Sequence, residues 1–280
     1  MLGLVGGTAA LAASPPTPTV STLSLPLTKR NMAKRATPEA NLTPRKVRCL
    51  NTEAPKLATS AVTIIVGNSP NQETFLVHDN ILKQHSNFFA AALKEGWKEA
   101  ERHVVRLPGE KPEEVRHFVN FAYYGKLFVA ETKSEGEAEE ERLDRIDREF
   151  EMLEDCWCVG ERLLLLNFQD AVSDSLLDLV TKEARFPSEM HERIYAISSG
   201  PRAFKRLLVD FAVFAWHKRT HESLEANAAN SQFLQDLSLR FRQAWTQKES
   251  GSGPYNEPVG CKYHEHVAAG KPCYQTLFPE

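Results

Sequence analysis

The sequence is poor in the features that mark secreted, membrane-spanning and strongly basic proteins. Its 280 residues contain only five cysteines, an odd and scattered set that does not form a disulfide framework. No apolar run approaches the ~20 residues that a membrane-spanning helix needs. The net charge of −3 argues against a protein that binds nucleic acid through bulk positive charge. We therefore expect a protein of the nucleus or cytoplasm with no membrane partner, and we do not expect direct nucleic-acid binding.

Signatures of catalysis are also missing from the sequence. There is no glycine-rich phosphate loop, no HExxH zinc-protease motif and no GxSxG nucleophile motif. We therefore expect no enzymatic activity. A metal-dependent enzyme remains the alternative class, and turnover that is lost on addition of EDTA would favour it.

Residues 1–60 are rich in proline, serine, threonine and alanine. Such a segment cannot bury enough apolar surface to offset the entropy lost on ordering, so we expect a disordered tail. Its apolar start lacks a preceding basic residue, and we favour a disordered start over a secretion or import signal. Basic clusters at 29–35 and 45–48 are either a nuclear import signal or a solvated linker.

Ordered structure is predicted to begin near residue 61. Short β-branched runs predict strands at 62–66 and 73–78, joined by a turn at 67–70. A similar run predicts a third strand at 103–107. These segments together predict a small sheet whose first two strands form a hairpin.

Helix start and stop signals follow the strands. Asp79 and Ser86 can each cap a short helix, because their side-chain oxygens can accept early backbone N–H bonds. Pro112 suits the first position of a longer helix, and Gly125 suits its end. Apolar residues at helical spacing lie between these two positions and predict one buried face.

The next part of the chain is divided between a charged run and further helices. Residues 131–149 are mainly acidic, and we expect a solvated insertion, either a loop or an exposed helical extension; an acidic binding patch is the alternative. Helical periodicity resumes at 150–166 and 168–182.

The last hundred residues predict two different regions. Residues 186–248 predict a helical extension, and residues 249–280 predict a loop-rich tail with a Cys/His cluster. In the extension, apolar residues at spacings of three and four mark one helix face: Leu234, Leu237, Phe241 and Trp245.

Two segments carry a more specific pattern. VHDNILKQHSNFFAAAL supplies a histidine, leucine, serine and phenylalanine at set intervals, which are His78, Leu82, Ser86 and Phe89. PEEVRHFVNFAYYGKL supplies an aromatic pair and a glycine at the end of the long helix, which are Tyr123, Tyr124 and Gly125. With the order of strands and helices, these residues resemble the BTB/POZ domain, most closely its fungal group. The resemblance implies an α+β fold, a small sheet with a helical cluster over residues 61–185, followed by the C-terminal helical extension.

The resemblance also implies a function in protein–protein interaction. Members of this family are dimerisation modules or adaptors that link a target to a cullin-type ubiquitin ligase scaffold. Cullin-binding members resemble one another in a hydrophobic–x–Glu motif between the second helix and the third strand, where this chain has Trp97 and Glu99. An aromatic anchor beside a carboxylate is a plausible hot spot. The alternative is that Trp97 folds back onto the core.

Two further alternatives concern self-association and the nucleus. Family dimers often use a strand and helix before the hairpin, but residues 40–60 give no clear amphipathic helix. A homodimer would then use the first helix, around Ile81 and Leu82. The alternative function is a nuclear transcription-related regulator that acts through partners bound by the BTB domain, and salt-sensitive DNA binding by residues 1–60 would favour it.

The C-terminal stretch VGCKYHEHVAAGKPCY holds four potential metal ligands: Cys261, His264, His266 and Cys273. Two thiolates and two imidazoles would complete a tetrahedral zinc shell, and four protein ligands would make the zinc structural. The spacing departs from that of common zinc fingers. The two histidines would point to opposite sides of an extended chain, so only a tight turn brings them together. An unstructured tail is the alternative.

Overall fold

The computed structural model of the protein describes residues 59–216, 218–222, 224, 228–247, 253 and 259–278. Of the tail predicted for residues 1–60, residues 1–58, which include both basic clusters, lie outside this part of the chain. Within it, no helix is both long enough and apolar enough to cross a bilayer.

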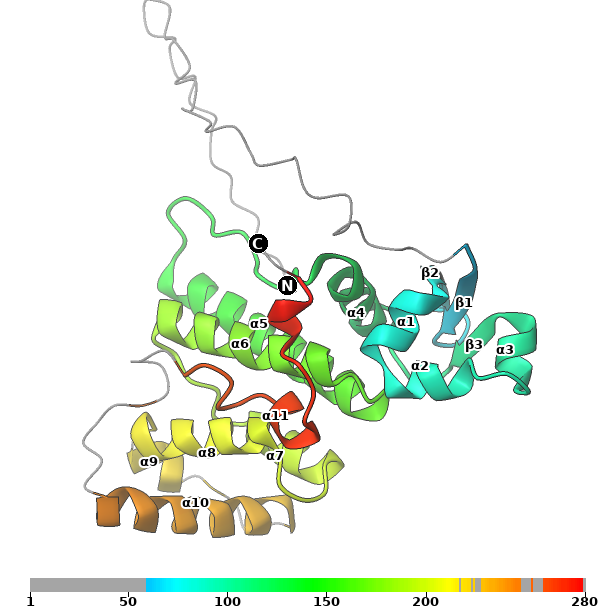
Figure 1. Cartoon of the computed structure of the whole chain (residues 1–280). Coiled ribbons are helices and arrows are strands. Elements are labelled where there is room, and N and C mark those ends of the chain that lie inside the picture. Colours follow the sequence, from blue (N-terminus) through cyan, green and yellow to red (C-terminus); the bar gives the residue numbers. More distant parts are fainter. Residues whose placement is uncertain are drawn as a thin grey trace, which may run out of the picture. The chain divides into compact units, whose positions relative to one another are not determined.

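A three-stranded sheet forms the N-terminal end of this part (Figure 1). β1 (Ala61–Val66) lies between β2 (Glu73–His78), its antiparallel partner, and β3 (Val104–Leu107), which runs parallel to it. Alternate residues of β1 are fully buried, because a strand turns every second side chain to the same face. The predicted hairpin and third strand are confirmed.

Three short helices connect β2 to β3: α1 (Asp79–His85), α2 (Asn87–Ala92) and α3 (Lys98–Arg102). Ser86 caps α2 as predicted, since its Oγ accepts the Phe89 N–H at 3.0 Å. The same hydroxyl donates to the Leu163 carbonyl at 2.8 Å and so ties this corner to a distant helix. The predicted Asp79 cap is wrong, because Asp79 lies inside α1 and binds Lys83 instead.

α4 (Pro112–Tyr124) follows the sheet and has the start and stop that the sequence predicts. Pro112 opens the helix, and Gly125 ends it in the left-handed conformation with φ of 65°. Phe118 and Phe121 are fully buried. The Phe118 ring stacks on Phe89 with centroids 6.1 Å apart, which fixes α4 against α2.

The charged run 131–149 forms a loop and then the start of a helix, so it includes the helical extension that the sequence left open, and all but three of its residues are at least partly exposed. Its second half is the start of α5 (Glu139–Arg162), which begins 11 residues before the predicted helix at 150. Arg145, Ile146 and Glu149 are buried there. Charged side chains can be buried on a helix when they form ion pairs. Arg145 forms ion pairs with Glu137, Glu149 and Glu183.

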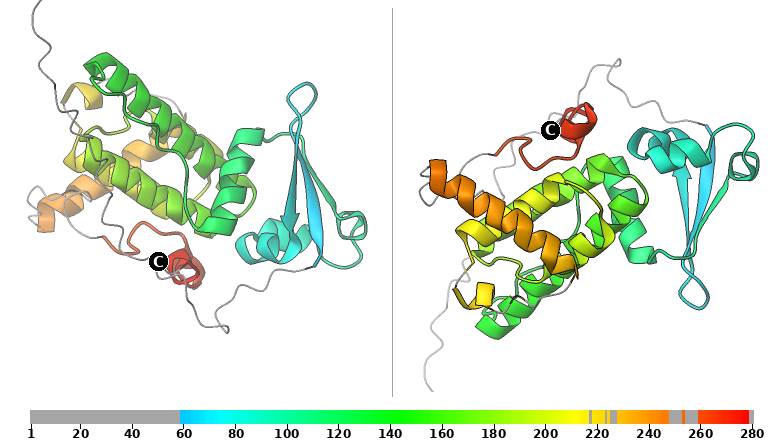
Figure 2. Two further views of the ribbon diagram at one scale, coloured as in Figure 1. Left: turned by 90° about the horizontal axis from the view of Figure 1, so that it is seen from above. Right: turned by 90° about the horizontal axis from the view of Figure 1, so that it is seen from below.

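α5 packs along α6 (Leu166–Glu183), and Figure 2 shows the two long helices side by side. Their contact faces belong to one hydrophobic core that is continuous with the sheet and α4. Trp157 of α5 is fully buried and stacks on Phe204 at 5.2 Å. The core therefore joins the sheet to the helices that follow.

The extension consists of α7 (Met190–Ile197), α8 (Ala203–Phe214), α9 (Lys218–Glu222) and α10 (Ala228–Gln247). The apolar face predicted for α10 is only partly correct. Leu237 is buried, together with Phe233, but Leu234, Phe241 and Trp245 are exposed. The face that packs on α7 is rotated from the predicted one, because Phe233 fills the space beside His191 and Tyr195.

The C-terminal segment returns to the main core instead of extending away from it. It contains α11 (His266–Ala269) and the 3-10 helix η2 (Tyr274–Thr276), and it runs past α6 (Figure 1). The Phe278 ring stacks on His85 with centroids 5.4 Å apart and lies against Gly125. Residues separated by nearly two hundred positions in the sequence therefore share one packed surface.

Candidate functional site

A compact turn brings the four predicted metal ligands together. Cys261 and His264 lie in one tight turn, in which the His264 N–H donates to the Cys261 carbonyl at 3.2 Å. His266 follows as the first residue of α11. Cys273 follows after Gly270, which ends α11 in the left-handed conformation. The ligand atoms of all four side chains lie within 4.8 Å of one another.

Two aspartates of α6 orient the histidines of this cluster. His264 Nε2 lies 2.8 Å from Asp174 Oδ1, and His266 Nδ1 lies 2.6 Å from Asp170 Oδ2. The nitrogens left for a metal are His264 Nδ1, 3.8 Å from Cys273 Sγ, and His266 Nε2. Carboxylates that hold the outer nitrogen of a ligating histidine are typical of zinc sites.

The two aspartates are themselves held in place. The Tyr274 hydroxyl donates to Asp174 Oδ2 at 2.6 Å, and the Gln275 amide donates to the same oxygen at 3.0 Å. Asp170 is fully buried and accepts the Glu265 backbone N–H. The hydrogen bonds of these aspartates therefore fix the orientation of both histidine rings.

The electrostatics of the cluster favour a cation. Burial lowers the pKa of His264, but the hydrogen bond and charge of Asp174 outweigh burial and raise it above its usual value. Burial raises the pKa of Asp170, against the opposing effect of His266. Burial, then the neighbouring Cys261 thiol, raises the pKa of Cys273. A bound divalent cation would supply the positive charge that thiolates at this position need.

The donor set and its dimensions fit zinc. In a tetrahedral site with Zn–S of about 2.3 Å and Zn–N of about 2.0 Å, ligand atoms lie roughly 3.3–3.8 Å apart. Atoms that already lie within 4.8 Å need shifts of less than about an ångström to close on an ion. Two sulfurs and two nitrogens would complete the coordination shell, so this arrangement can hold a structural metal and leaves no open position for a reacting molecule.

A second candidate site is an apolar groove beside β3. Its cavity of about 540 Å³ is lined by Phe88, Trp97, Val104 and Val105 together with charged residues that include Glu99. Trp97 precedes α3 and is 59% exposed, so it does not fold back onto the core. Glu99 lies in the first turn of α3 and is partly exposed at the same groove. The structure thus places both residues of the predicted motif on one accessible surface.

The first helix offers less surface than the sequence predicts. Leu82 is fully buried in the main core, so its assignment to a partner-binding surface is wrong. A helix of two turns packed on the sheet must turn one face inward, and Leu82 is on that face. Ile81 is partly exposed and remains available for contact.

The residues that carry the family pattern stabilise the corner between β2 and α1. The His78 backbone N–H donates to the Tyr123 hydroxyl at 3.0 Å, and His78 Nδ1 lies 2.7 Å from the same oxygen. Phe89 is fully buried, whereas Tyr124 is 64% exposed. A β-carbon at Gly125 would meet the Phe278 ring at 2.3 Å, so the glycine serves both the turn and a close contact.

Asp170 and Asp174 are the residues of this candidate site that the sequence did not reveal. They are four apart in a helical pattern and therefore share one face of α6, but acidic pairs at this spacing are common on solvated helices. Only the burial of Asp170 distinguishes this pair, and burial depends on the tertiary fold.

A comparison with known families agrees with the fold and the residue pattern. The family model of the BTB/POZ domain matches residues 52–143. No curated protein matches the chain. The matched range includes the sheet, α1 to α4 and the Trp97 groove, and BTB/POZ domains bind protein partners and dimerise. The chain therefore contains a BTB/POZ domain, a protein–protein interaction module, followed by additional C-terminal helices.

Proposed function

We propose that this protein is a non-enzymatic adaptor whose BTB/POZ domain docks on a cullin-type scaffold through the groove at Trp97. The observation that carries the proposal is the exposure of Trp97 at the rim of an apolar groove. A large aromatic side chain costs free energy when water covers it, and interfaces recover that free energy by enclosing it. Aromatic residues of this kind dominate interface energetics.

The charges around the groove support a specific docking geometry. Glu99 stands on α3 close to Trp97, and Lys98, Arg102 and Arg106 also line the cavity. Polar groups at the rim of an interface orient the partner, while the apolar centre supplies most of the affinity. The groove combines both parts on one face of the domain.

A homodimer is the second mode of association within this proposal. BTB/POZ domains dimerise, and Ile81 is the partly exposed apolar residue of α1. The segment 40–58, which precedes the hairpin, lies outside the described residues. We further propose that the protein works in the nucleus or cytoplasm, since the buried thiols of Cys156 and Cys158 are free.

We further propose that the cluster of Cys261, His264, His266 and Cys273 binds one structural zinc ion. Support comes from the mutual approach of the four ligand atoms and from the carboxylates that orient both histidines. The ion would stabilise a segment of short turns, in which packing alone buries few apolar side chains. The segment would then hold Phe278 against α4 and α1.

The adaptor proposal is tested by capture of a recombinant cullin N-terminal domain on the immobilised full chain. Wild-type protein is expected to retain the cullin domain, and Trp97→Ala is expected to lose it. Trp245→Ala is the matched control, since Trp245 is 86% exposed but lies outside the groove. Equal retention by the wild type and Trp97→Ala, with both folded, would remove the groove from the account.

The zinc proposal is tested by elemental analysis of the purified, reduced full chain. One zinc per chain is expected for wild type, and Cys261→Ser is expected to reduce zinc to background. Cys49→Ser is the control, because it also replaces one cysteine but leaves the four proposed ligands unchanged. A wild-type chain without bound metal after refolding in zinc would end the proposal.

A further inference from the structure

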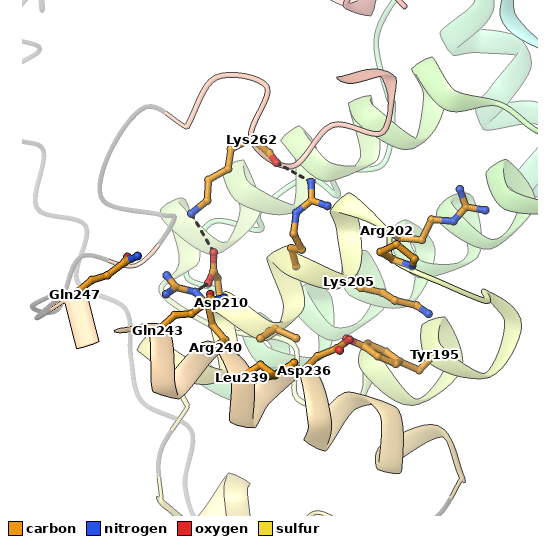
Figure 3. Close-up of a pocket in the computed structure, with 13 residues that line it drawn as sticks. Tyr195, Arg202, Lys205, Asp210, Asp236, Leu239, Arg240, Gln243, Gln247 and Lys262 are labelled. Carbon is orange, nitrogen blue, oxygen red and sulfur yellow. Dashed lines mark hydrogen bonds and ion pairs between the residues drawn. The ribbon is translucent and has the colours of Figure 1, made fainter. Parts of the chain in front are cut away.

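A second groove, unrelated to the BTB/POZ surface, lies between α8 and α10 (Figure 3). It has a volume of about 450 Å³ and is completed by the end of α7 and by Lys262 of the C-terminal segment. Its volume is within the range of ligand-binding pockets. All the residues that line this groove lie outside residues 52–143, which the BTB/POZ model matches.

Five basic side chains line this groove: Arg202, Lys205, Arg206, Arg240 and Lys262. Three carboxylates offset them, of which Asp210 and Asp236 also line the groove and Glu161 binds Arg202 from α5. Five cations against three anions leave a local charge of +2. The groove is therefore positive in a chain whose net charge is −3.

The carboxylates of the groove are already occupied. Asp210 is buried and is shared by Arg240, Lys262 and the Tyr263 hydroxyl. Asp236 accepts the Tyr195 hydroxyl at 2.8 Å. Their oxygens are committed to neighbouring donors, so these acids neutralise only part of the basic charge.

Lys205 and Arg206 have no carboxylate partner among the described residues. Lys205 is buried, and its ammonium donates to the carbonyls of Ser198 at 2.6 Å and Gly200 at 3.2 Å. Arg206 is exposed and donates to the Lys262 carbonyl at 3.3 Å. Lys205 also lies 4.4 Å above the Tyr195 ring. Three carboxylates act on its charge only through space: Asp236, Glu161 and Glu265. A buried ammonium without a direct ion pair is costly, and an anion bound in the groove would offset part of that cost.

The shape of the groove points to a chain-like ligand. Its lining runs from Arg202 to Asp210 along α8 and from Asp236 to Gln247 along α10, a length of roughly 12–16 Å at 1.5 Å per residue. An extended peptide rises about 3.3 Å per residue, so four or five residues fit this length. Figure 3 shows Gln243 and Gln247 near one end, where their amides can bind a peptide backbone, and Tyr195 at the other.

Apolar side chains lie among the charges. Val209 and Leu239 line the groove; Val209 is buried, and Leu239 is 48% exposed. An inorganic anion would leave the Leu239 side chain in water. A peptide with acidic residues on either side of an apolar one would contact both kinds of lining.

We propose that the groove between α8 and α10 binds an extended acidic segment of a partner protein. Carboxylates of the segment would lie beside Lys205, Arg206 and the Arg240–Lys262 pair, and its apolar side chain would lie against Leu239 and Val209. The groove would give an adaptor a second binding surface, but the proposal does not depend on a cullin at the Trp97 groove.

The test is fluorescence anisotropy of the full chain with a labelled Glu-Glu-Leu-Glu-Glu peptide. Wild-type protein is expected to bind this peptide, more weakly as salt rises, and not the Gln-Gln-Leu-Gln-Gln analogue. Arg206→Glu and Gln243→Glu change exposed residues. Arg206→Glu removes a charge-assisted contact, Gln243→Glu places a negative charge beside the acidic peptide, and each is expected to weaken binding by roughly tenfold or more. Lys126→Glu changes an exposed lysine outside the groove and is expected to bind as wild type.

Several outcomes would overturn the proposal. They are a wild-type chain that does not bind the acidic peptide, equal binding by all variants, and displacement of the peptide by sulfate at equal charge concentration. A further outcome is that the wild-type chain self-associates but does not bind the peptide, and that Arg206→Glu loses the self-association. This result would show that a second copy of the chain fills the groove, and it would also overturn the proposal. Trp97→Ala is expected to bind the peptide normally, so a failed adaptor proposal remains distinguishable.

Discussion

Arg145 tests how the charged run 131–149 is built into the fold. Its guanidinium lies 2.9 Å from Glu137, 3.2 Å from Glu149 and 3.4 Å from Glu183, and its side chain is only 4% exposed. Arg145→Met keeps a long side chain at this position but removes the charge. The buried carboxylates then lose their central cation.

The expected loss of stability in Arg145→Met depends on which of the three carboxylates keep another partner. Glu183 keeps Lys133 at 2.7 Å and Arg142 at 3.0 Å. Glu137 and Glu149 have no other ion pair among the described residues, although Glu149 still accepts the Glu131 N–H. Removing one partner of a buried pair costs about 3–5 kcal/mol, and we expect about 3 kcal/mol because these compensations remain.

Urea denaturation at pH 7 of the wild type and two variants measures this cost. Arg148→Met is the matched control, because Arg148 lies on the same helix but is 53% exposed in its pair with Glu131. Such a surface pair contributes about 0–1 kcal/mol. A loss below about 1 kcal/mol for Arg145→Met, or equal losses for both variants, would refute the reasoning.

Two further predictions concern the surface where the C-terminal segment packs. Burial lowers the pKa of His85 from about 6.5 to about 4, so its contribution to stability is present above pH 6.5 and is lost as pH falls toward 4. Between pH 6.5 and pH 4, His85→Phe is therefore expected to lose up to about 3 kcal/mol less free energy of unfolding than wild type, as measured by urea denaturation. The same dependence of unfolding free energy on pH in both proteins would contradict this prediction. Gly125→Ala is expected to cost about 2 kcal/mol more than Gly136→Ala in thermal unfolding, since both have positive φ but only Gly125 touches Phe278; equal costs would show that this contact adds nothing.

Local signals made the first half of the BTB/POZ domain predictable. Ser86 and Gly125 act within a few residues of their own position, and the β-branched run at 62–66 directly indicates a strand. Such signals require no knowledge of distant parts of the chain. The family pattern then ordered these elements in space.

The residues whose burial was not predicted from the sequence are buried through tertiary contacts. Leu82 belongs to an apolar helix face, but the sequence does not show whether the sheet or a partner covers that face. Arg145 and Glu149 appear solvated in the sequence because charge patterning contains no information on burial. Their ion pairs include Glu183, which lies 38 residues from Arg145 and packs beside it only through the pairing of α5 with α6.

The cluster of four possible metal ligands was predictable from the types of residue present, but its geometry was not. Four ligand types within a short stretch are visible in the sequence, whereas their convergence needs the turns at 260–264 and the start of α11 at His266. Asp170 and Asp174 come from a different helix altogether. A site assembled from two distant segments can be recognised only once both are placed.

Isothermal titration calorimetry of the full chain with a purified cullin N-terminal domain measures scaffold binding directly. We expect saturable binding by wild type, a loss of about 2 kcal/mol or more in binding free energy for Trp97→Ala, and unchanged binding for Trp245→Ala. Identical affinities for wild type and a folded Trp97→Ala, or no detectable heat with the wild-type chain, would contradict the assignment of the Trp97 groove as the scaffold-binding surface.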